Sequence, residues 1–138
     1  MIQIKEKKYI LQTTSKNCFV YSALNAAIYL GQKNLPDFEL ISEIANKDGY
    51  TDEQGVIDFL NLPMRKTRSE DFLFTSGGIG ILQQPKNLHA VFIEPEEDNK
   101  IKIINSGLSS ELIDVWETVK IIDYLPANRN HRLYWAFK

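Results

Sequence analysis

The one cysteine of the chain, Cys18, stands where a thiol could act as a nucleophile. It falls in the first turn of a predicted helix, where unpaired backbone N–H groups and the helix dipole favour the thiolate, the reactive form. A buried structural cysteine would suit the same position, because cysteine is among the most frequently buried residue types. Position alone therefore leaves a nucleophile and a core residue as equal alternatives.

A histidine and an asparagine come from two segments that the sequence predicts to be neighbouring strands. His89 lies near the start of the apolar run 88–94, and Asn105 ends the alternating run 100–105. The turn-forming residues 95–99 separate the runs, so the two strands are predicted to pair as a hairpin. The two polar side chains are therefore expected on adjacent strands.

The register of that hairpin decides whether His89 and Asn105 meet. If the loop is residues 95–99, Glu94 pairs with Lys100, and His89 lies directly opposite Asn105 with side chains roughly 5 Å apart. The amide could then accept from one ring nitrogen and leave the other to face a thiol. A cross-strand polar pair without chemical function is the alternative, and a slip of one residue would move every side chain to the opposite face.

Gln12 lies six residues before Cys18 and could supply one more hydrogen-bond donor. Its side-chain amide, together with the backbone N–H of Cys18, could hold the oxyanion that forms when a thiolate attacks a carbonyl. A glutamine at this spacing carries no information alone. In combination with the cysteine, histidine and asparagine it indicates acyl chemistry.

The segments that hold these residues resemble the active-site segments of papain-like cysteine peptidases. The first is Gln12-Thr-Thr-Ser-Lys-Asn-Cys18-Phe-Val-Tyr-Ser-Ala. The second is His89-Ala-Val, followed sixteen residues later by Asn105-Ser. The stretch 37–62, with an acidic entry and a glycine near its middle, resembles the bacterial double-glycine (C39-like) peptidases.

The resemblance implies a role for each of the four residues. Cys18 would be the nucleophile and His89 the general base and acid. Asn105 would orient the imidazole, and Gln12 would be the oxyanion donor. The resemblance implies no cofactor and no metal, and the substrate would be a peptide or a protein.

The sequence also departs from the family pattern. The usual Gly-Ser before the nucleophile is Lys-Asn at 16–17, and the glycine that follows a C39-type cysteine is Phe19 here. Residues 107–108, Gly-Leu, replace the tryptophan that shields the histidine–asparagine bond in papain. His89 follows Cys18 by 71 residues, whereas papain-type enzymes use about 130–150. Much of the second papain subdomain is therefore expected to be absent.

Apolar periodicity predicts the elements that would position these residues. A helix stripe runs from Cys18 to Leu30 and ends at Gly31. A second helix is predicted from Pro36 to Gly49 and a third over 52–60, before Pro63. The second helix is expected to turn these residues inward: Phe38, Leu40, Ile41, Ile44 and Ala45. Strands are predicted over 72–74, 79–83, 88–94, 100–105, 119–124 and 132–137, with short extended segments at 2–4 and 9–11.

Helices followed by strands predict one α+β domain over residues 1–138, a minimal papain-like fold with N-terminal helices packed on a C-terminal antiparallel sheet. Several other features are interpreted as structural: the glycine-rich 75–80 as a turn, Glu94–Asp98 as a hairpin tip, and 64–68 and His131 as loops. The aromatic residues expected in the core are Trp116, Tyr124, Tyr134, Trp135 and Phe137.

Composition bounds the class of protein. The chain has 138 residues, 43% hydrophobic and 25% charged, with a net charge of −2, which predicts a soluble globular domain. The sequence has no basic face that would indicate nucleic-acid binding, and no apolar run is long enough for a membrane helix. One cysteine and two histidines cannot build a usual zinc centre. The N-terminal residues lack a secretory signal, so we expect a cytoplasmic protein, with leaderless export as an effector left open.

The sequence thus favours a cysteine hydrolase that cleaves an amide bond through a Cys-His-Asn triad and a thioester acyl-enzyme. A deamidase or transglutaminase would use the same apparatus with another acyl donor or acceptor. A different class is also open: a papain-fold module that binds a partner without catalysis, as an effector or inhibitor. The size suggests a bacterial or viral protein, and the sequence does not determine the oligomeric state.

Overall fold

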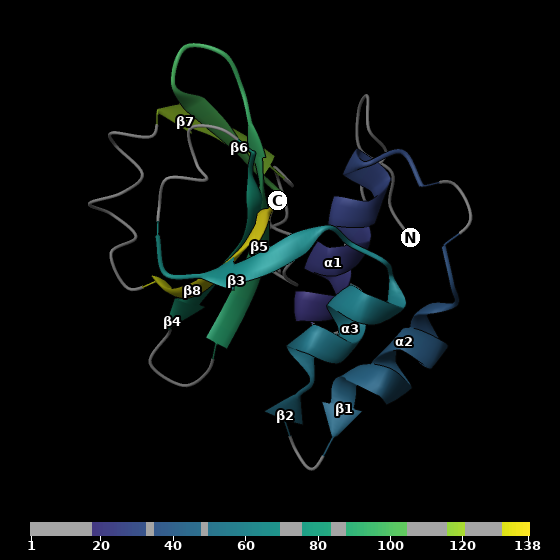
Figure 1. Cartoon of the computed structure of the whole chain (residues 1–138). Helices are drawn as coiled ribbons and strands as arrows, with labels where there is room; N and C mark the ends of the chain where they lie inside the picture. The colour runs from purple at the N-terminus through teal and green to yellow at the C-terminus, as the bar shows by residue number, and fades with distance from the viewer. Residues whose placement is uncertain are drawn as a thin grey trace.

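A computed structural model describes residues 18–32, 35–47, 50–69, 76–83, 88–104, 116–120 and 131–138 (Figure 1). These residues form helices α1 (Cys18–Tyr29), α2 (Phe38–Ala45) and α3 (Glu53–Phe59). The strands are β1 (Asn46–Lys47), β2 (Tyr50–Thr51), β3 (Met64–Thr67), β4 (Gly78–Gln83), β5 (Leu88–Pro95), β6 (Lys100–Ile104), β7 (Trp116–Lys120) and β8 (His131–Phe137).

The molecule has two layers, with the helices on one side of a sheet (Figure 1). The described strands of this sheet follow the order β3-β8-β4-β5-β6-β7, and every neighbouring pair is antiparallel. Strands β1 and β2 form a separate short hairpin beside the helices. The predicted α+β class, with helices first and antiparallel sheet second, is confirmed.

Helix α1 lies at the centre of the fold. Its residues 19–27 are all buried, because β4 and β5 contact the helix from the sheet while α2 and α3 also pack against it. The helix ends as predicted at Gly31, which has a φ of 87° and donates its backbone N–H to the carbonyl of Ile28 at 2.9 Å. A left-handed residue at this point favours glycine.

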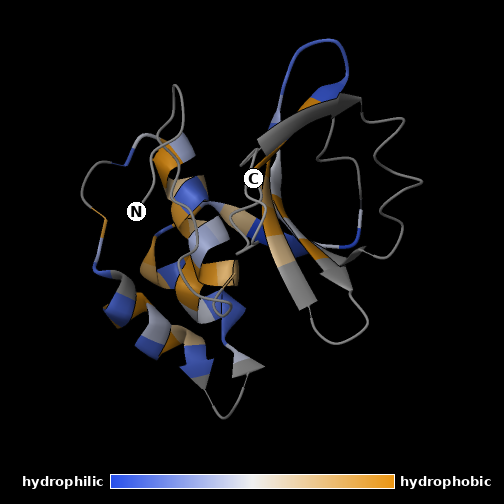
Figure 2. Cartoon of the chain, turned by 180° about the vertical axis from the view of Figure 1, so that it is seen from behind, coloured by the Kyte–Doolittle hydropathy of each residue, from blue (hydrophilic) through white to orange (hydrophobic). Residues whose placement is uncertain are grey.

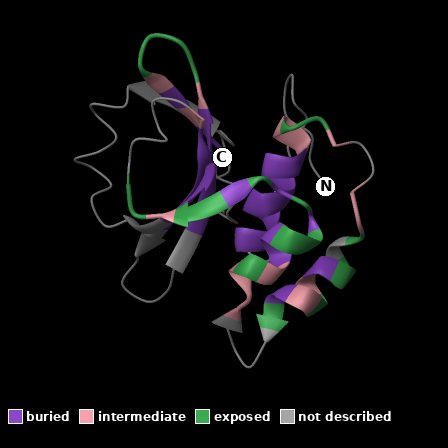
Figure 3. Ribbon diagram, viewed as in Figure 1, coloured by how far each residue is buried: buried purple, intermediate pink, exposed green. Residues whose placement is uncertain are grey.

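Alternating residues of the central strands face two apolar clusters. Ala90 and Phe92 of β5 belong to the cluster between the sheet and the helices, whereas Val91 and Ile93 belong to a cluster on the other face. Figure 2 shows apolar residues along α1 and in the strands beside it, and Figure 3 shows that both are buried. Both faces of β5 are therefore covered over these residues.

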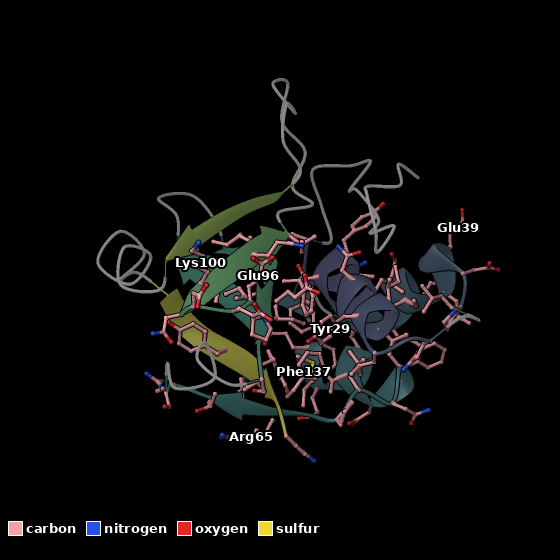
Figure 4. All side chains as sticks on the ribbon, turned by 90° about the horizontal axis from the view of Figure 1, so that it is seen from above. Tyr29, Glu39, Arg65, Glu96, Lys100 and Phe137 are labelled. Atoms are coloured by element: carbon pink, nitrogen blue, oxygen red, sulfur yellow. The ribbon has the colours of Figure 1, made fainter. Side chains whose placement is uncertain are left out.

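Aromatic side chains join the C-terminal end of α1 to the sheet. Tyr29 lies 5.5 Å from Phe92 and 5.8 Å from Phe137 between ring centroids (Figure 4). The predicted core positions Tyr134, Trp135 and Phe137 are buried. The side chain of Trp116 and all of Tyr124 lie outside the described part of the structure.

Two segments that we predicted to be loops are strands. Residues Met64–Thr67 form the edge strand β3, in which Met64 is buried and pairs with Phe137 of β8. His131 is the first residue of β8 and pairs with Leu82 of β4. The tertiary pairing overrides the charged, loop-like local composition, because a strand at the edge needs only one apolar face.

The other predicted elements differ at their boundaries. Helix α2 ends at Ala45, before Gly49, because the chain enters the β1–β2 hairpin, which was not predicted. Leu40 is 47% exposed, so its predicted inward orientation is wrong, whereas Ile41 is fully buried. The strand predicted over 119–124 is described as β7 at Trp116–Lys120. The segments predicted over 2–4, 9–11 and 72–74 lie outside the described residues.

The predicted register between β5 and β6 is wrong by two residues. Glu94 pairs with Lys102, not with Lys100. Asp98 and Asn99 adopt left-handed φ angles of 59° and 57°, and the N–H of Lys100 donates to the carbonyl of Glu97 at 3.3 Å. Asp and Asn accept this conformation more readily than most residues. The turn is therefore tighter than the predicted five-residue loop, but a two-residue shift keeps every side chain on its predicted face.

An ion-pair cluster supports this register. The Nζ of Lys102 lies 3.6 Å from Oε2 of Glu94, which is buried, and 3.1 Å from Oε1 of Glu96. Burial alone would lower the pKa of Lys102, but the hydrogen bond to Glu96 and the two carboxylate charges raise the pKa above its ordinary 10.5. Because the pKa of Lys102 is higher in the folded protein than in the unfolded chain, the two ion pairs stabilise the fold fully at neutral pH. This contribution to stability is lost only as the pH rises past the raised pKa of Lys102.

Two glycines allow a test of how tightly β4 is packed. A Cβ on Gly78 would collide with the carbonyl oxygen of Trp135, whereas a Cβ on Gly31 would meet nothing within 4 Å. We expect Gly78→Ala to lower the free energy of unfolding by about 3 kcal/mol or more. Gly31→Ala should cost roughly 1–2 kcal/mol, from its left-handed φ alone. Urea unfolding of both variants measures the difference, and equal losses would contradict the close approach of β4 and β8.

Candidate active site

Cys18 is the first residue of α1, and its thiol lies against β5. The backbone N–H of Ala90 donates to Sγ of Cys18 at 3.4 Å. The side chain of Cys18 is partly exposed, in contrast to the fully enclosed residues that follow it in the helix. The fold thus brings together residues 72 positions apart.

The direction of the Ala90 N–H places the thiol beside the strand. Backbone N–H groups of a strand point along the sheet toward a neighbouring strand, and not out of its faces. The described pairing of β5 with β6 begins at Phe92, two residues beyond Ala90. The sulfur therefore lies beside β5, and Cys18 packs against the apolar cluster between the helices and the sheet.

The N-terminus of α1 also favours a negative charge on this sulfur. Its first turn contains no acidic residue that would offset the partial positive charge of the helix end. The Ala90 N–H adds a donor that interacts more strongly with a thiolate than with a thiol. Both interactions act directly on Cys18.

The structure brings one predicted partner into the immediate neighbourhood of the thiol. His89 lies in β5, directly before Ala90 in the chain, and its backbone pairs with Leu82 of β4. The side chain of His89 lies outside the described part of the structure. Its backbone lies next to the residue that donates to Sγ, and a contact between the thiol and the imidazole stays a prediction.

The other two predicted site residues, Gln12 and Asn105, lie outside the described residues. Asn105 directly follows Ile104, the last described residue of β6, which pairs with Phe92. The predicted pairing of Asn105 directly opposite His89 rested on the register that the described strands do not have.

The structure reveals contributions that the sequence analysis missed. The donor from Ala90 is a backbone group, so no residue type could have signalled it. Phe19, noted only as a departure from the C39 pattern, is buried and packs edge-on against Trp135, with 6.4 Å between ring centroids. Neither contact could be derived without the packing of α1 on the sheet.

Two further observations concern ligands and membranes. Within the described residues, no group of three or more His, Cys, Asp or Glu side chains could hold a metal ion. Among the helices that the structure describes, none has the length and apolar character needed to span a membrane.

No protein-family model matches the sequence. The structure is similar to the peptidase domain of Streptococcus ComA, a bi-functional ABC transporter involved in a quorum sensing pathway, with a TM-score of 0.67. The similarity covers 96% of this chain and all of that domain at 16% sequence identity. At this identity the comparison establishes the fold, and it confirms the predicted arrangement of helices packed on an antiparallel sheet.

A sequence comparison finds a different relative. A stretch of 100 residues, 72% of this chain, is 33% identical to part of the DNA-directed RNA polymerase subunit beta'' of Cyanidium caldarium. The matched stretch spans 7% of the length of that subunit.

The contact between Ala90 and Cys18 predicts a spectroscopic signature. Because an N–H···S bond strengthens when sulfur becomes negatively charged, we expect the amide resonance of Ala90 to move as Cys18 ionises. NMR titration measures this shift, with the amide of Phe92 as a reference two residues further along β5. The shift should vanish in Cys18→Ala, and identical behaviour of the two amides in the parent chain would contradict the bond.

Proposed function

We propose that this chain is a cysteine peptidase of papain-like type, which cleaves an amide bond of a peptide or protein. The observation that carries the proposal is the position of Cys18: the helix N-terminus and the Ala90 N–H converge on Sγ, one residue from His89. A purely structural cysteine requires neither partial exposure nor a donor on its sulfur. The fold shared with the ComA peptidase domain supports this interpretation.

In the proposed reaction, His89 accepts the proton of the Cys18 thiol, and the thiolate attacks the substrate carbonyl carbon. The resulting oxyanion is held by the backbone N–H of Cys18 and the side-chain amide of Gln12. Collapse of the tetrahedral intermediate breaks the C–N bond, and His89 donates its proton to the leaving amine. Asn105 keeps the imidazole oriented through both transfers.

Water completes the cycle. His89 removes a proton from a water molecule, whose oxygen attacks the thioester carbon, and the carboxylic acid leaves as Cys18 recovers its proton. The Ala90 N–H lies on the sulfur and not on the oxyanion, so its contribution is to stabilise the thiolate before attack. If an amine replaced water, the same acyl-enzyme would yield transamidation, and a glutamine side chain as acyl donor would yield deamidation.

A second candidate function is a papain-fold module that binds a protein partner without catalysis. The similarity to a short part of an RNA polymerase subunit favours it, because that segment belongs to a protein named for another activity. The departures at 16–17 and at Phe19 from the family pattern agree with this candidate. The two candidate functions predict different reactivities for the Cys18 thiol.

The rate of iodoacetamide labelling of Cys18 against pH tests the proposal. For an active site we expect a labelling midpoint well below about 8.5, the ordinary cysteine pKa, because His89, the helix end and Ala90 all favour the thiolate. His89→Ala should move the midpoint back toward the ordinary value and slow labelling at neutral pH by about tenfold or more.

His131→Ala is the matched control, since it removes the other histidine of the chain from the same sheet. His131 and His89 both pair with Leu82, so their backbones are two strands apart, about 10 Å. We expect His131→Ala to label like the parent chain. Slow labelling with a midpoint near the ordinary cysteine pKa in the parent chain, His89→Ala and His131→Ala alike would overturn the catalytic proposal and favour the binding module.

Cleavage itself is measured by incubating the chain with a mixture of peptides of defined sequence and following new termini by mass spectrometry. We expect cleavage by the parent chain that is lost in Cys18→Ala, because no other residue can form the thioester. Asn105→Ala should retain about 1% to 10% of the rate, since it orients but does not carry the proton. A mass increase of about 1 Da without cleavage would identify deamidation in place of peptide hydrolysis, as expected if amide nitrogen is exchanged for oxygen.

A further inference from the structure

Trp135 of β8 joins three elements around the N-terminal end of α1. Its indole is 1% exposed and contacts the Phe19 ring edge-on, at 6.4 Å and an interplanar angle of 63°. Its Nε1–H donates to Oε1 of Glu53, the first residue of α3, at 2.7 Å. The Nζ of Lys66 on β3 lies 5.7 Å from the centre of the same ring.

Phe19 connects this cluster to the thiol because it directly follows Cys18 in the helix. Both residues belong to one rigid helical turn, so the position of the Phe19 ring constrains where the Cys18 sulfur lies. Phe19 is 4% exposed and belongs to the cluster of buried residues between helices and sheet. A shift of the ring against Trp135 would therefore move Sγ relative to the Ala90 N–H.

Glu53 constrains the orientation of the indole. A buried indole N–H needs an acceptor, and a carboxylate is a stronger one than a neutral oxygen. The start of α3, which carries Glu53, is held in place through the neighbouring Asp52. The side chain of Asp52 caps the helix by accepting from the N–H of Gly55 at 3.0 Å, and its backbone N–H donates to the carbonyl of Ala45 at 2.6 Å. Helix α3 thus sets the rotation of Trp135.

We propose that Glu53 and Trp135 are positioning residues for Cys18: through Phe19 they hold the first turn of α1 so that Sγ stays within hydrogen-bond distance of the Ala90 N–H. The inference deepens the proposed function and rests on it for its catalytic meaning. It also gives Phe19 a role, since a glycine in its place could not contact Trp135. The geometry itself, Sγ against Ala90, exists whether or not the chain is an enzyme.

A role in stability alone is the competing explanation, and the other end of α1 offers a matched control. There, Tyr29 stacks on Phe137 at 5.8 Å between ring centroids, and Phe137 is buried like Trp135. Phe137→Leu loosens the same helix against the same strand, but at the end remote from Cys18. Urea unfolding of each variant shows whether the losses of stability are comparable.

The experiment compares Trp135→Phe, Glu53→Ala, Glu53→Gln and Phe137→Leu in the full chain. Two properties are measured: the pH profile of Cys18 labelling by iodoacetamide and the rate of hydrogen exchange of the Ala90 amide. Because a misplacement of about 1 Å can cost about 100-fold in rate, we expect Trp135→Phe and Glu53→Ala to slow labelling at neutral pH at least about fivefold. Their labelling midpoints should rise, and the Ala90 amide should exchange faster.

Glu53→Gln retains an acceptor oxygen for the indole N–H, so it should label and exchange within about twofold of the parent chain. Phe137→Leu should leave both properties unchanged at a comparable loss of stability. The inference is overturned if Glu53→Ala and Trp135→Phe behave like the parent, or if Phe137→Leu has the same effect as they do.

The two measurements separate this inference from the proposed function. If the parent chain labels slowly with an ordinary midpoint, the peptidase proposal fails, but exchange at Ala90 still reports whether Glu53 and Trp135 hold Sγ in place. If the parent labels readily and the exchange and labelling of the variants are unchanged, the positioning role fails while the peptidase proposal stands.

Discussion

The burial of α1 on all sides is the constraint on which the rest of this structure depends. A helix whose residues 19–27 are all buried needs cover around its whole circumference, and no single layer supplies it. The sheet covers one side through β4 and β5, while α2 and α3 pack against the helix as well. Each fully buried large side chain contributes about 1.5–3 kcal/mol relative to an exposed one. The positions of β4, β5, α2 and α3 follow from covering this helix.

The same constraint determines what Cys18 can do. Because α1 is buried over residues 19–27, its partly exposed first residue lies at the boundary of the core, with the thiol against β5. A nucleophile requires a fixed position together with partial exposure of its residue. The backbone N–H of Ala90 is directed at the thiol. Local chemistry at the site is thus a consequence of how α1 packs against β5.

The similarity to the ComA peptidase domain concerns the fold and leaves individual contacts free to differ. The ComA peptidase domain shares the arrangement of elements at 16% identity, which is compatible with many side-chain substitutions around a retained fold. Phe19 illustrates such a substitution. Where the C39 pattern has glycine, this chain has a buried ring packed on Trp135, and Trp135 is in turn bonded to Glu53 of α3. The fold is therefore supported by contacts particular to this chain around the first turn of α1.

The sequence by itself determined α1, its end at Gly31, the strands β4, β5, β6 and β8, and the α+β class, because apolar periodicity and turn residues are local signals. Only the tertiary structure decided the β5–β6 register, the strand character of β3 and the exposure of Leu40. The register depends on two left-handed residues, and edge pairing depends on a partner more than sixty residues away. For the candidate site, residue types and spacing indicated Cys18 and His89. The donor from Ala90 could not be predicted, since a backbone N–H carries no residue identity and meets the sulfur only once helix and sheet pack together.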